Sequence, residues 1–111
     1  MENCLFCKII AGEIPSNKVY EDEQVLAFRD IAPQAPVHVL IVPKRHMANV
    51  LECDGETAQQ LVAAVKKVAE LEGVAESGFR VVSNCGRDGA QTVGHLHIHV
   101  LGGKQLPENM G

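Results

Sequence analysis

The chain has 111 residues and a net charge of −4, and 46% of its residues are hydrophobic but only 4% are aromatic. A chain of this length is expected to form a single domain, residues 1–111, with a buried core. Its acidic balance, without runs of Lys and Arg or interleaved aromatic residues, argues against nucleic-acid binding and against an anionic membrane surface as partner.

The N-terminal stretch and the apolar segments indicate a cytoplasmic protein. MENCLFCKII lacks the basic region and small-residue cleavage site of a secretory signal. The longest apolar stretch, residues 37–43, is too short to cross a bilayer. In the cytoplasm the four cysteines are expected to stay reduced. They are Cys4, Cys7, Cys53 and Cys85.

The first half of the chain predicts a short helix, a hairpin and a buried strand. Residues 3–16 begin as a knuckle and a short helix that ends at Gly12. Residues 18–31 alternate apolar and polar side chains around a turn at 21–23, which predicts a β-hairpin. Residues 37–43, VHVLIVP, are a β-branched run typical of a buried strand.

Residues 55–72 predict one long amphipathic helix. Apolar side chains recur there at the i, i+3, i+4, i+7 spacing of a helix face. We expect Asp54 or Thr57 to cap the helix and Gly73 to end it. The expected apolar face consists of Leu61, Val62, Val65, Val68, Ala69 and Leu71.

Two further strands are predicted on either side of a glycine-rich loop. FRVVSN, residues 79–84, reads as a strand, and the loop of residues 84–94 leads to a final strand that contains HLHIHVL, residues 95–101. Strands in hairpin-like order with one long helix predict an α+β fold, in which an antiparallel sheet packs against that helix.

Three of the five histidines alternate along the final strand, as His95, His97 and His99. Alternate residues of a strand share one face and lie about 6.6 Å apart. We therefore expect the three imidazoles on one face and three aliphatic side chains on the other. One such histidine would be an ordinary half-buried residue, but three at this spacing indicate a functional site.

Two kinds of chemistry fit this row of imidazoles. Alternating histidines can chelate one catalytic zinc ion. Alternatively, one imidazole is a nucleophile toward phosphorus, because its neutral form is abundant near pH 7 and its second nitrogen can be oriented by a hydrogen bond. The loop favours the second interpretation, since its glycines let backbone N–H groups approach an anion and Asn84, Gln91 and Thr92 add neutral donors. Loop and histidines together favour phosphoryl or nucleotidyl transfer.

Cys4 and Cys7 form a CxxC pair. By itself this spacing fits a redox dithiol, a pair of metal ligands or a chance arrangement. A redox pair normally follows a strand, and none is predicted before Cys4. Zinc would need two further ligands. The residues favour metal binding and leave all five histidines as candidates: His38, His46, His95, His97 and His99.

Two long motifs resemble those of a known family. HLHIHVL matches His-φ-His-φ-His-φ-φ, in which φ is apolar, and the spacing from Asn84 to His95 also fits. FRDIAPQAPVHVLIVPKRH, residues 28–46, resembles the second hallmark of the same family. The family is the histidine triad (HIT) family, in its Hint branch of nucleoside phosphoramidases, and the resemblance covers residues 4–103. It implies the HIT-like fold, an antiparallel sheet of about five strands with one long helix and a short N-terminal helix.

The resemblance implies cleavage of purine nucleoside 5′-phosphoramidates to AMP or GMP and an amine, with no organic cofactor. His97 would attack the α-phosphorus and form a nucleotidyl-histidine, which water then hydrolyses. His99 would hydrogen-bond the phosphate, and His38 would support the triad. Asn84 and Thr92 would hold phosphate oxygens or the leaving group.

The nucleotide contacts are implied by the same resemblance. Asp30 would bind the ribose hydroxyls, although alone it could be a turn cap, and Phe28 alone could be a core residue. The complete implied set is Leu5, Phe6, Ile9, Phe28, Asp30, Ile31, Asn84, Ala90, Gln91, Thr92, His97 and His99.

A structural zinc ion is also implied. Some bacterial members and the related galactose-1-phosphate uridylyltransferases hold zinc on a CxxC pair, a later histidine and the first histidine of the triad. Cys4, Cys7, His46 and His95 occupy the matching places here. Two thiolates would neutralise Zn²⁺, so the metal would be structural and His95 would take no part in the chemistry.

The sequence departs from the Hint pattern at three places. Ala90 stands where glycine is usual, and Thr92 stands where many members have serine. The tail, residues 102–111, lacks the Trp-Pro-Pro-Gly ending that helps to shape the substrate pocket across the dimer. The lack of this ending is expected to affect which leaving group the enzyme prefers more than which reaction it catalyses.

Other functions remain open at this point. A dinucleoside polyphosphate hydrolase is the sister activity of the family, and a nucleotide-binding regulatory protein with weak catalysis is a second alternative. A three-histidine catalytic zinc enzyme would leave Cys4 and Cys7 without a role. The resemblance implies a homodimer, although the helix at 57–72 could equally pack only on its own sheet.

Overall fold

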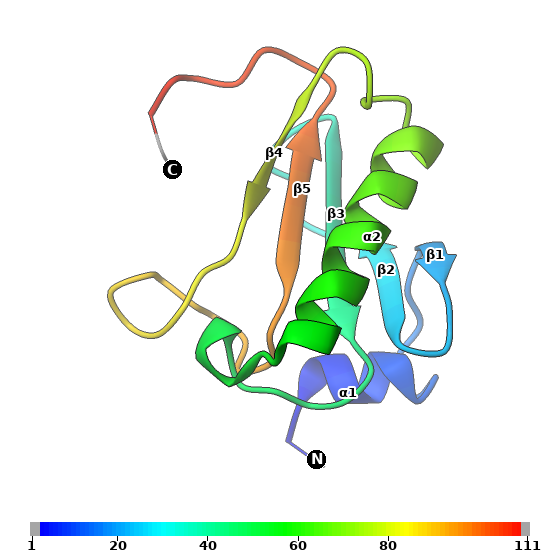
Figure 1. The fold of residues 1–111 in the computed structure, drawn as a ribbon, viewed down its shortest axis with the longest axis vertical. Coiled ribbons are helices and arrows are strands. Elements are labelled where there is room, and N and C mark those ends of the chain that lie inside the picture. The colour runs from blue at the N-terminus through cyan, green and yellow to red at the C-terminus, as the bar shows by residue number, and fades with distance from the viewer. Residues whose placement is uncertain (1–2, 110–111) are drawn as a thin grey trace.

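The computed structural model describes residues 3–109, whose five strands form one antiparallel sheet in the order β1-β2-β3-β5-β4 (Figure 1). The strand that comes last in the sequence thus lies between two earlier ones. This arrangement confirms the predicted α+β fold. The strands are β1 Lys18–Glu21, β2 Val25–Arg29, β3 Val37–Pro43, β4 Phe79–Val82 and β5 Ile98–Gly102.

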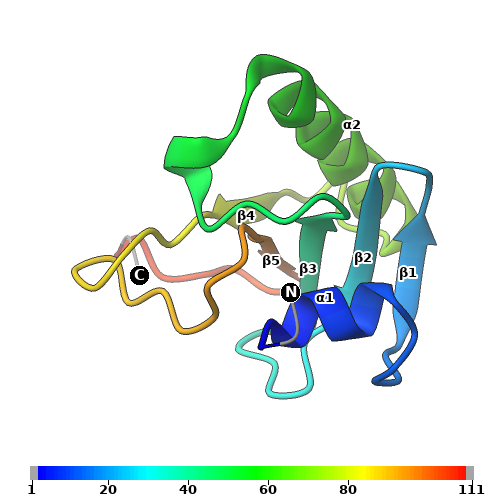
Figure 2. The same cartoon turned by 90° about the horizontal axis from the view of Figure 1, so that it is seen from below.

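Two helices lie on opposite faces of the sheet (Figure 2). On one face, α2 (Gly55–Leu71) buries Leu61 and Val68 against β2, β3 and β5. On the other face, α1 (Leu5–Ile10) packs Phe6 and Ile9 against β2 and β3. No helix among residues 3–109 is long and apolar enough to cross a membrane.

Local signals in the sequence located most elements correctly. The predicted hairpin is formed by β1 and β2, and Asp22 Oδ1 accepts a hydrogen bond from the backbone N–H of Val25 in its turn. The predicted strand 37–43 is β3. Asp54 caps α2, because its Oδ1 accepts the Thr57 N–H at 2.7 Å, and Gly73 follows the helix end with φ +73°. A 3₁₀ turn before α2, η1 (Val50–Glu52), was not predicted.

Part of the predicted apolar face of α2 is wrong. Val62 is 63% exposed and Leu71 is 59% exposed, whereas Ala64, which was not predicted to face the core, is only 2% exposed. Ala64 lies between Leu61 and Val68 on the stripe that faces the sheet, and Val62 and Leu71 lie at the two edges of that stripe. The buried stripe is therefore narrower than the run of apolar residues.

The histidine strand begins later than predicted. β5 starts at Ile98, so His95 and His97 precede it. Pairing with β3 ends at Ile98, and the Leu96 backbone N–H donates to the carbonyl of Met47 at 2.7 Å. In the segment just before β5, side chains still alternate between the two faces of the sheet. Leu96 belongs to the core under α2, whereas the rings of His95 and His97 contact Phe6 of α1 on the other face.

Candidate active site and metal cluster

A hydrogen bond to the main chain sets which nitrogen of the neutral His97 ring carries the proton. Its Nδ1 lies 2.7 Å from the backbone carbonyl of His95. A carbonyl only accepts, so Nδ1 carries the proton and Nε2 keeps its lone pair. The ring is 5% exposed, and Phe6 packs edge-on against it with the ring centroids 5.1 Å apart. An imidazole whose tautomer and orientation are fixed in this way can act as a nucleophile.

His38 and His99 form a chain of hydrogen bonds that assigns a second tautomer. The Gln34 backbone N–H donates to His38 Nδ1 at 3.0 Å, so His38 carries its proton on Nε2. That Nε2 lies 2.9 Å from His99 Nδ1 and donates to it. His99 therefore carries its own proton on Nε2. This N–H is left to donate to an anion.

Burial keeps these two imidazoles neutral at neutral pH. Together with the neighbouring His97 and His38, burial lowers the pKa of His99 to about 4. Burial also lowers the pKa of His38, against the opposing effect of the Asp30 carboxylate, whose Oδ2 lies 3.5 Å from His38 Nε2. The site thus offers an anion an uncharged N–H donor.

A pocket of about 300 Å³ is lined by His97 and His99. Its walls come from α1, the end of β2 and the segment before β5. Most of the lining is apolar and Asp30 contributes a carboxylate, a combination that suits a flat base attached to a polar sugar. Nine predicted site residues line it: Leu5, Phe6, Ile9, Phe28, Asp30, Ile31, Thr92, His97 and His99.

The sequence did not single out several other residues of this pocket. Leu40 is one, and it lies directly opposite His99 in the register of β3 and β5. Finding it would have required the strand pairing, which the local pattern does not contain. The others are Ile14, Pro15, Ser16, Arg29 and Val93.

Four potential metal ligands meet at the start of α1: Cys4, Cys7, His46 and His95. Cys4 Sγ lies 3.2 Å from His95 Nδ1, Cys7 Sγ lies 3.4 Å from His46 Nδ1, and the two Nδ1 atoms are 3.1 Å apart. Bonds of about 2.0–2.3 Å from zinc to nitrogen and sulfur give a tetrahedron with edges of roughly 3.3–3.7 Å. The observed separations are close to those edges.

His95 is oriented as a metal ligand would be. It is fully buried, and its Nε2 donates to the Pro43 carbonyl at 2.9 Å, so the bare Nδ1 faces the sulfur atoms. Burial lowers the pKa of His95 and favours its neutral form. Burial and the adjacent Cys4 raise the pKa of the Cys7 thiol to about 11, and a bound cation would oppose that by stabilising the thiolate. The donor set fits a closed, structural zinc site.

Asp30, His38 and His99 also approach one another closely enough to hold an ion. His38 Nδ1, however, accepts the Gln34 N–H, so ligation through Nε2 would require an imidazolate. Among the described residues, these three side chains are therefore better explained by the hydrogen-bonded chain.

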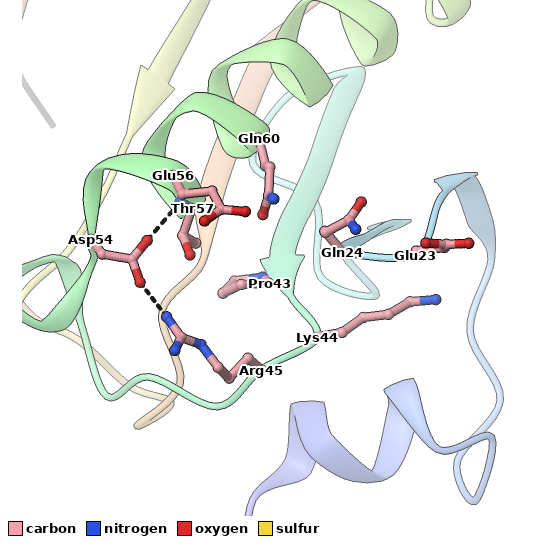
Figure 3. Close-up of a pocket in the computed structure, with 9 residues that line it drawn as sticks. All are labelled: Glu23, Gln24, Pro43, Lys44, Arg45, Asp54, Glu56, Thr57 and Gln60. Atoms are coloured by element: carbon pink, nitrogen blue, oxygen red, sulfur yellow. Dashed lines mark hydrogen bonds and ion pairs between the residues drawn. The ribbon is translucent and has the colours of Figure 1, made fainter.

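A polar pocket lies between the end of β3 and the start of α2 (Figure 3). Arg45 pairs with Asp54, the residue that caps α2. Besides that pair, the lining holds one positive charge, on Lys44, and two negative charges, on Glu23 and Glu56, and it contains no histidine or cysteine. The pocket therefore offers no imidazole or thiol, either as a nucleophile or as a soft metal ligand.

The family model described as HIT domain matches residues 11–106. The chain belongs to the HIT family. It is 47% identical over 108 residues to the purine nucleoside phosphoramidase of Escherichia coli, covering 95% of this chain and 91% of that protein. It is 51% identical over 107 residues to the 14 kDa zinc-binding protein of Zea mays, covering 92% and 83%. A HIT family hydrolase from Legionella pneumophila superposes with a TM-score of 0.94 at 47% identity, covering 98% of this chain and all of that one.

In this HIT protein, Gln91 tethers the glycine-rich loop. Its Nε2 donates to the carbonyls of Ala48 at 2.6 Å and Val93 at 3.0 Å, and its Oε1 accepts the Gly86 N–H at 2.9 Å. Both amide hydrogens are therefore engaged within the protein. Gln91 was predicted to contact the nucleotide, but this geometry leaves it no hydrogen for a phosphate.

Asn84 and Ala90 also lie outside the pocket lining that contains His97. Asn84 Nδ2 donates to the Gly89 carbonyl at 2.7 Å, and its side chain lines a cavity of about 450 Å³ that it shares with His99.

Ala90 has φ +57°, in the left-handed region that glycine adopts most easily. This backbone conformation is a physical reason to expect glycine at position 90, as the family resemblance implies.

Proposed function

We propose that this HIT protein hydrolyses purine nucleoside 5′-phosphoramidates through a nucleotidyl transfer step. The observation that carries the proposal is the bare Nε2 of His97 in the same pocket as the N–H donor of His99. The phosphoramidase activity named for the Escherichia coli relative supports this choice of substrate.

The chemistry has two displacements at the α-phosphorus. His97 Nε2 attacks, and its bond to phosphorus forms as the bond to the amine breaks. His99 Nε2–H hydrogen-bonds a phosphate oxygen and keeps its proton, and the departing amine takes a proton from solvent water. Water then cleaves the His97–phosphorus bond, gives a proton back to the solvent and releases AMP or GMP. Thr92 lines the pocket and would hold a phosphate oxygen, and Asn84 would contact the leaving group.

The nucleoside would occupy the apolar part of the pocket. Asp30 would accept hydrogen bonds from the ribose hydroxyls. Because the chain carries a net charge of −4, local N–H dipoles must offset the repulsion of the phosphate. The side chains expected around the purine are Leu5, Phe6, Ile9, Phe28 and Ile31.

A single-turnover incubation tests this mechanism. The wild type and His97→Ala would react with adenosine phosphoramidate labelled at the α-phosphorus, and a quench in base would preserve any bond between phosphorus and histidine. Label that appears transiently on the wild type and never on the variant supports the proposal. AMP released by the wild type without trapped label would point to direct attack by water.

A dinucleoside polyphosphate hydrolase is the second candidate, and the cavity beyond His99 favours it. That cavity, of about 450 Å³, is lined by Arg80, Asn84 and His99, and a guanidinium binds phosphate groups well. The ratio of kcat/KM for diadenosine triphosphate to that for the phosphoramidate separates the two activities. Tight nucleotide binding without turnover of either substrate would indicate a regulatory nucleotide-binding protein.

A structural zinc ion at the cluster of Cys4, Cys7, His46 and His95 is part of the proposal. When bound, it would supply a cross-link between α1, the segment after β3 and the segment before β5. It would have no Lewis-acid role, because protein ligands take all four tetrahedral positions. The name of the Zea mays relative supports zinc as the metal.

Homodimer formation is supported by an exposed apolar face. Val62 on α2 is 63% exposed and Val81 on β4 is 48% exposed, and both line one apolar pocket. Leu51, 85% exposed, and Val50, 46% exposed, precede α2. A second copy would remove this surface from water.

We also propose a cytoplasmic location, because the four cysteines are free thiols.

A further inference from the structure

Helix α1 contributes to the metal cluster and to the nucleotide pocket. Cys4 is its N-cap and Cys7 lies in its first turn, and both belong to the metal cluster. From the same helix, Leu5, Phe6 and Ile9 line the pocket of His97. Any displacement of α1 would therefore change both sites together.

Phe6 of α1 places one side chain in contact with both sites. It is 4% exposed, and its ring packs edge-on against His95 of the cluster, with centroids 6.0 Å apart, and against His97, with centroids 5.1 Å apart. It also packs against Phe28 of the pocket, at 5.5 Å. A single buried ring thus contacts a potential metal ligand, the proposed nucleophile and a side chain of the proposed purine-binding pocket.

Helix α1 has only six residues, so it depends on its tertiary contacts for its position. A metal ion would fix Cys4 and Cys7 to His46 and His95, which come from distant parts of the chain. Without the ion, the weak interactions of thiols with imidazoles and the packing of Phe6 and Ile9 would have to hold the helix.

We infer that metal binding and nucleotide binding are coupled through α1, with Phe6 as the positioning residue. This inference rests on the proposed nucleotide site. The metal orders the wall of the pocket, so nucleotide binds more tightly to the loaded protein. Linkage requires nucleotide to strengthen metal binding by the same factor. We expect a factor of about ten, within the range that such couplings span.

Two binding measurements test the coupling. Calorimetry gives the Kd of AMP for the zinc-loaded and the chelator-treated protein. The rate at which the loaded protein releases zinc to an excess of chromogenic chelator, with and without saturating AMP, needs no stable apo-protein. We expect weaker AMP binding after zinc removal and slower zinc release with AMP. An unchanged zinc release rate at saturating AMP would overturn the inference.

Phe6→Leu and Ile31→Ala form a matched pair of variants. Phe6→Leu keeps all four ligands and an apolar side chain, so it should bind one zinc ion per chain while the effect of AMP on zinc release falls toward none. Ile31 lines the pocket but is fully exposed and is not part of α1. Ile31→Ala should weaken AMP binding and keep the coupling. A coupling of wild-type size in Phe6→Leu would remove Phe6 from the proposal.

Turnover of adenosine 5′-phosphoramidate, measured separately on the loaded wild type, distinguishes this inference from the proposed function. If AMP slows zinc release but the protein does not turn over the phosphoramidate, the coupling stands and the proposed hydrolase activity is wrong. If the protein turns over the phosphoramidate but AMP does not affect zinc release, the hydrolase activity stands and the coupling is wrong.

Discussion

His97 donates its Nδ1 proton to the backbone carbonyl of His95, at 2.7 Å. His95, one of the four potential metal ligands, therefore sets the tautomer of the proposed nucleophile through its main chain, while its side chain faces the other three ligands. This separates the roles of two histidines that are only two positions apart.

The hydrogen bond from His38 to His99 should matter to catalysis. His38→Ala removes the donor that holds His99 in its Nε2–H tautomer, and we expect kcat to fall about 10- to 100-fold, as for other supporting contacts of this kind. His38→Gln can still donate from its amide and should recover part of the loss. Steady-state kinetics of both variants check this, and equal activity in His38→Ala and the wild type would contradict it.

Acid should destabilise the protein through His99. Its pKa is about 4 in the folded state and about 6.5 when unfolded, so below pH 6.5 the unfolded chain binds more protons. The contribution of His99 to the unfolding free energy is fully present above pH 6.5 and declines as the pH falls toward 4. The loss reaches up to about 3 kcal/mol, at about 1.4 kcal/mol per pKa unit.

Urea unfolding of the wild type and His99→Gln at pH 7, 6 and 5 measures this contribution. Effects of acid on the metal cluster are common to both proteins and cancel in the difference. The stability gap between the two proteins should shrink as the pH falls. A gap independent of pH would show that burial does not depress the pKa of His99.

Replacement of Ala90 by glycine should stabilise the loop. Ala90 has φ +57°, where an L-residue costs about 1–2 kcal/mol relative to glycine, and the extra entropy of unfolded glycine cancels roughly half of that. We expect Ala90→Gly to gain about 0.5 kcal/mol. Ala63→Gly, at an exposed position inside α2, is the matched control and should lose about 1 kcal/mol. Thermal unfolding should give a higher Tm for Ala90→Gly and a lower Tm for Ala63→Gly than for the wild type. A lower Tm for Ala90→Gly would contradict the prediction.

Loss of one thiolate should release the metal. Cys4→Ser leaves three of the four ligands and also weakens the N-cap, since Cys4 Sγ accepts the Cys7 N–H at 3.3 Å. We expect bound zinc to fall from one per chain to near zero, by atomic absorption after dialysis, with a lower Tm. Cys53→Ser, outside the cluster, is the control. Zinc retained in Cys4→Ser would revive the model of a catalytic zinc held by three histidines.

A charge on the exposed apolar face should produce monomers. Val62→Asp places a carboxylate in the middle of the surface proposed to bury a second copy, where desolvation of the charge is unfavourable. Analytical ultracentrifugation should show a dimer for the wild type and a monomer for the variant. Lys67→Asp, an exposed change on another face of the same helix, is the control. A monomeric wild type at micromolar concentration would contradict the proposed dimer.

Local patterns in the sequence were sufficient for the elements. The hairpin of β1 and β2, strand β3 and helix α2 follow from periodicity and capping residues that lie within a few positions of each other. The three alternating histidines also indicated a site, because chance placement at that spacing is improbable, whereas the CxxC pair was ambiguous until the family resemblance placed His46 and His95 beside it. The breadth of the buried face of α2 and the start of β5 were not predicted correctly, since each depends on the partner surface.

The sequence by itself determined which side chains are candidates for the chemistry; only the tertiary structure decided which of them meet and where each proton lies. His38 and His99 are 61 positions apart, and their hydrogen bond exists because β3 pairs with β5 in one register. That contact, and the carbonyl beside His97, place each proton on one nitrogen. The same long-range packing directs the Gln91 amide into the protein. Proton positions depend on distances between groups, and only the folded chain sets those distances.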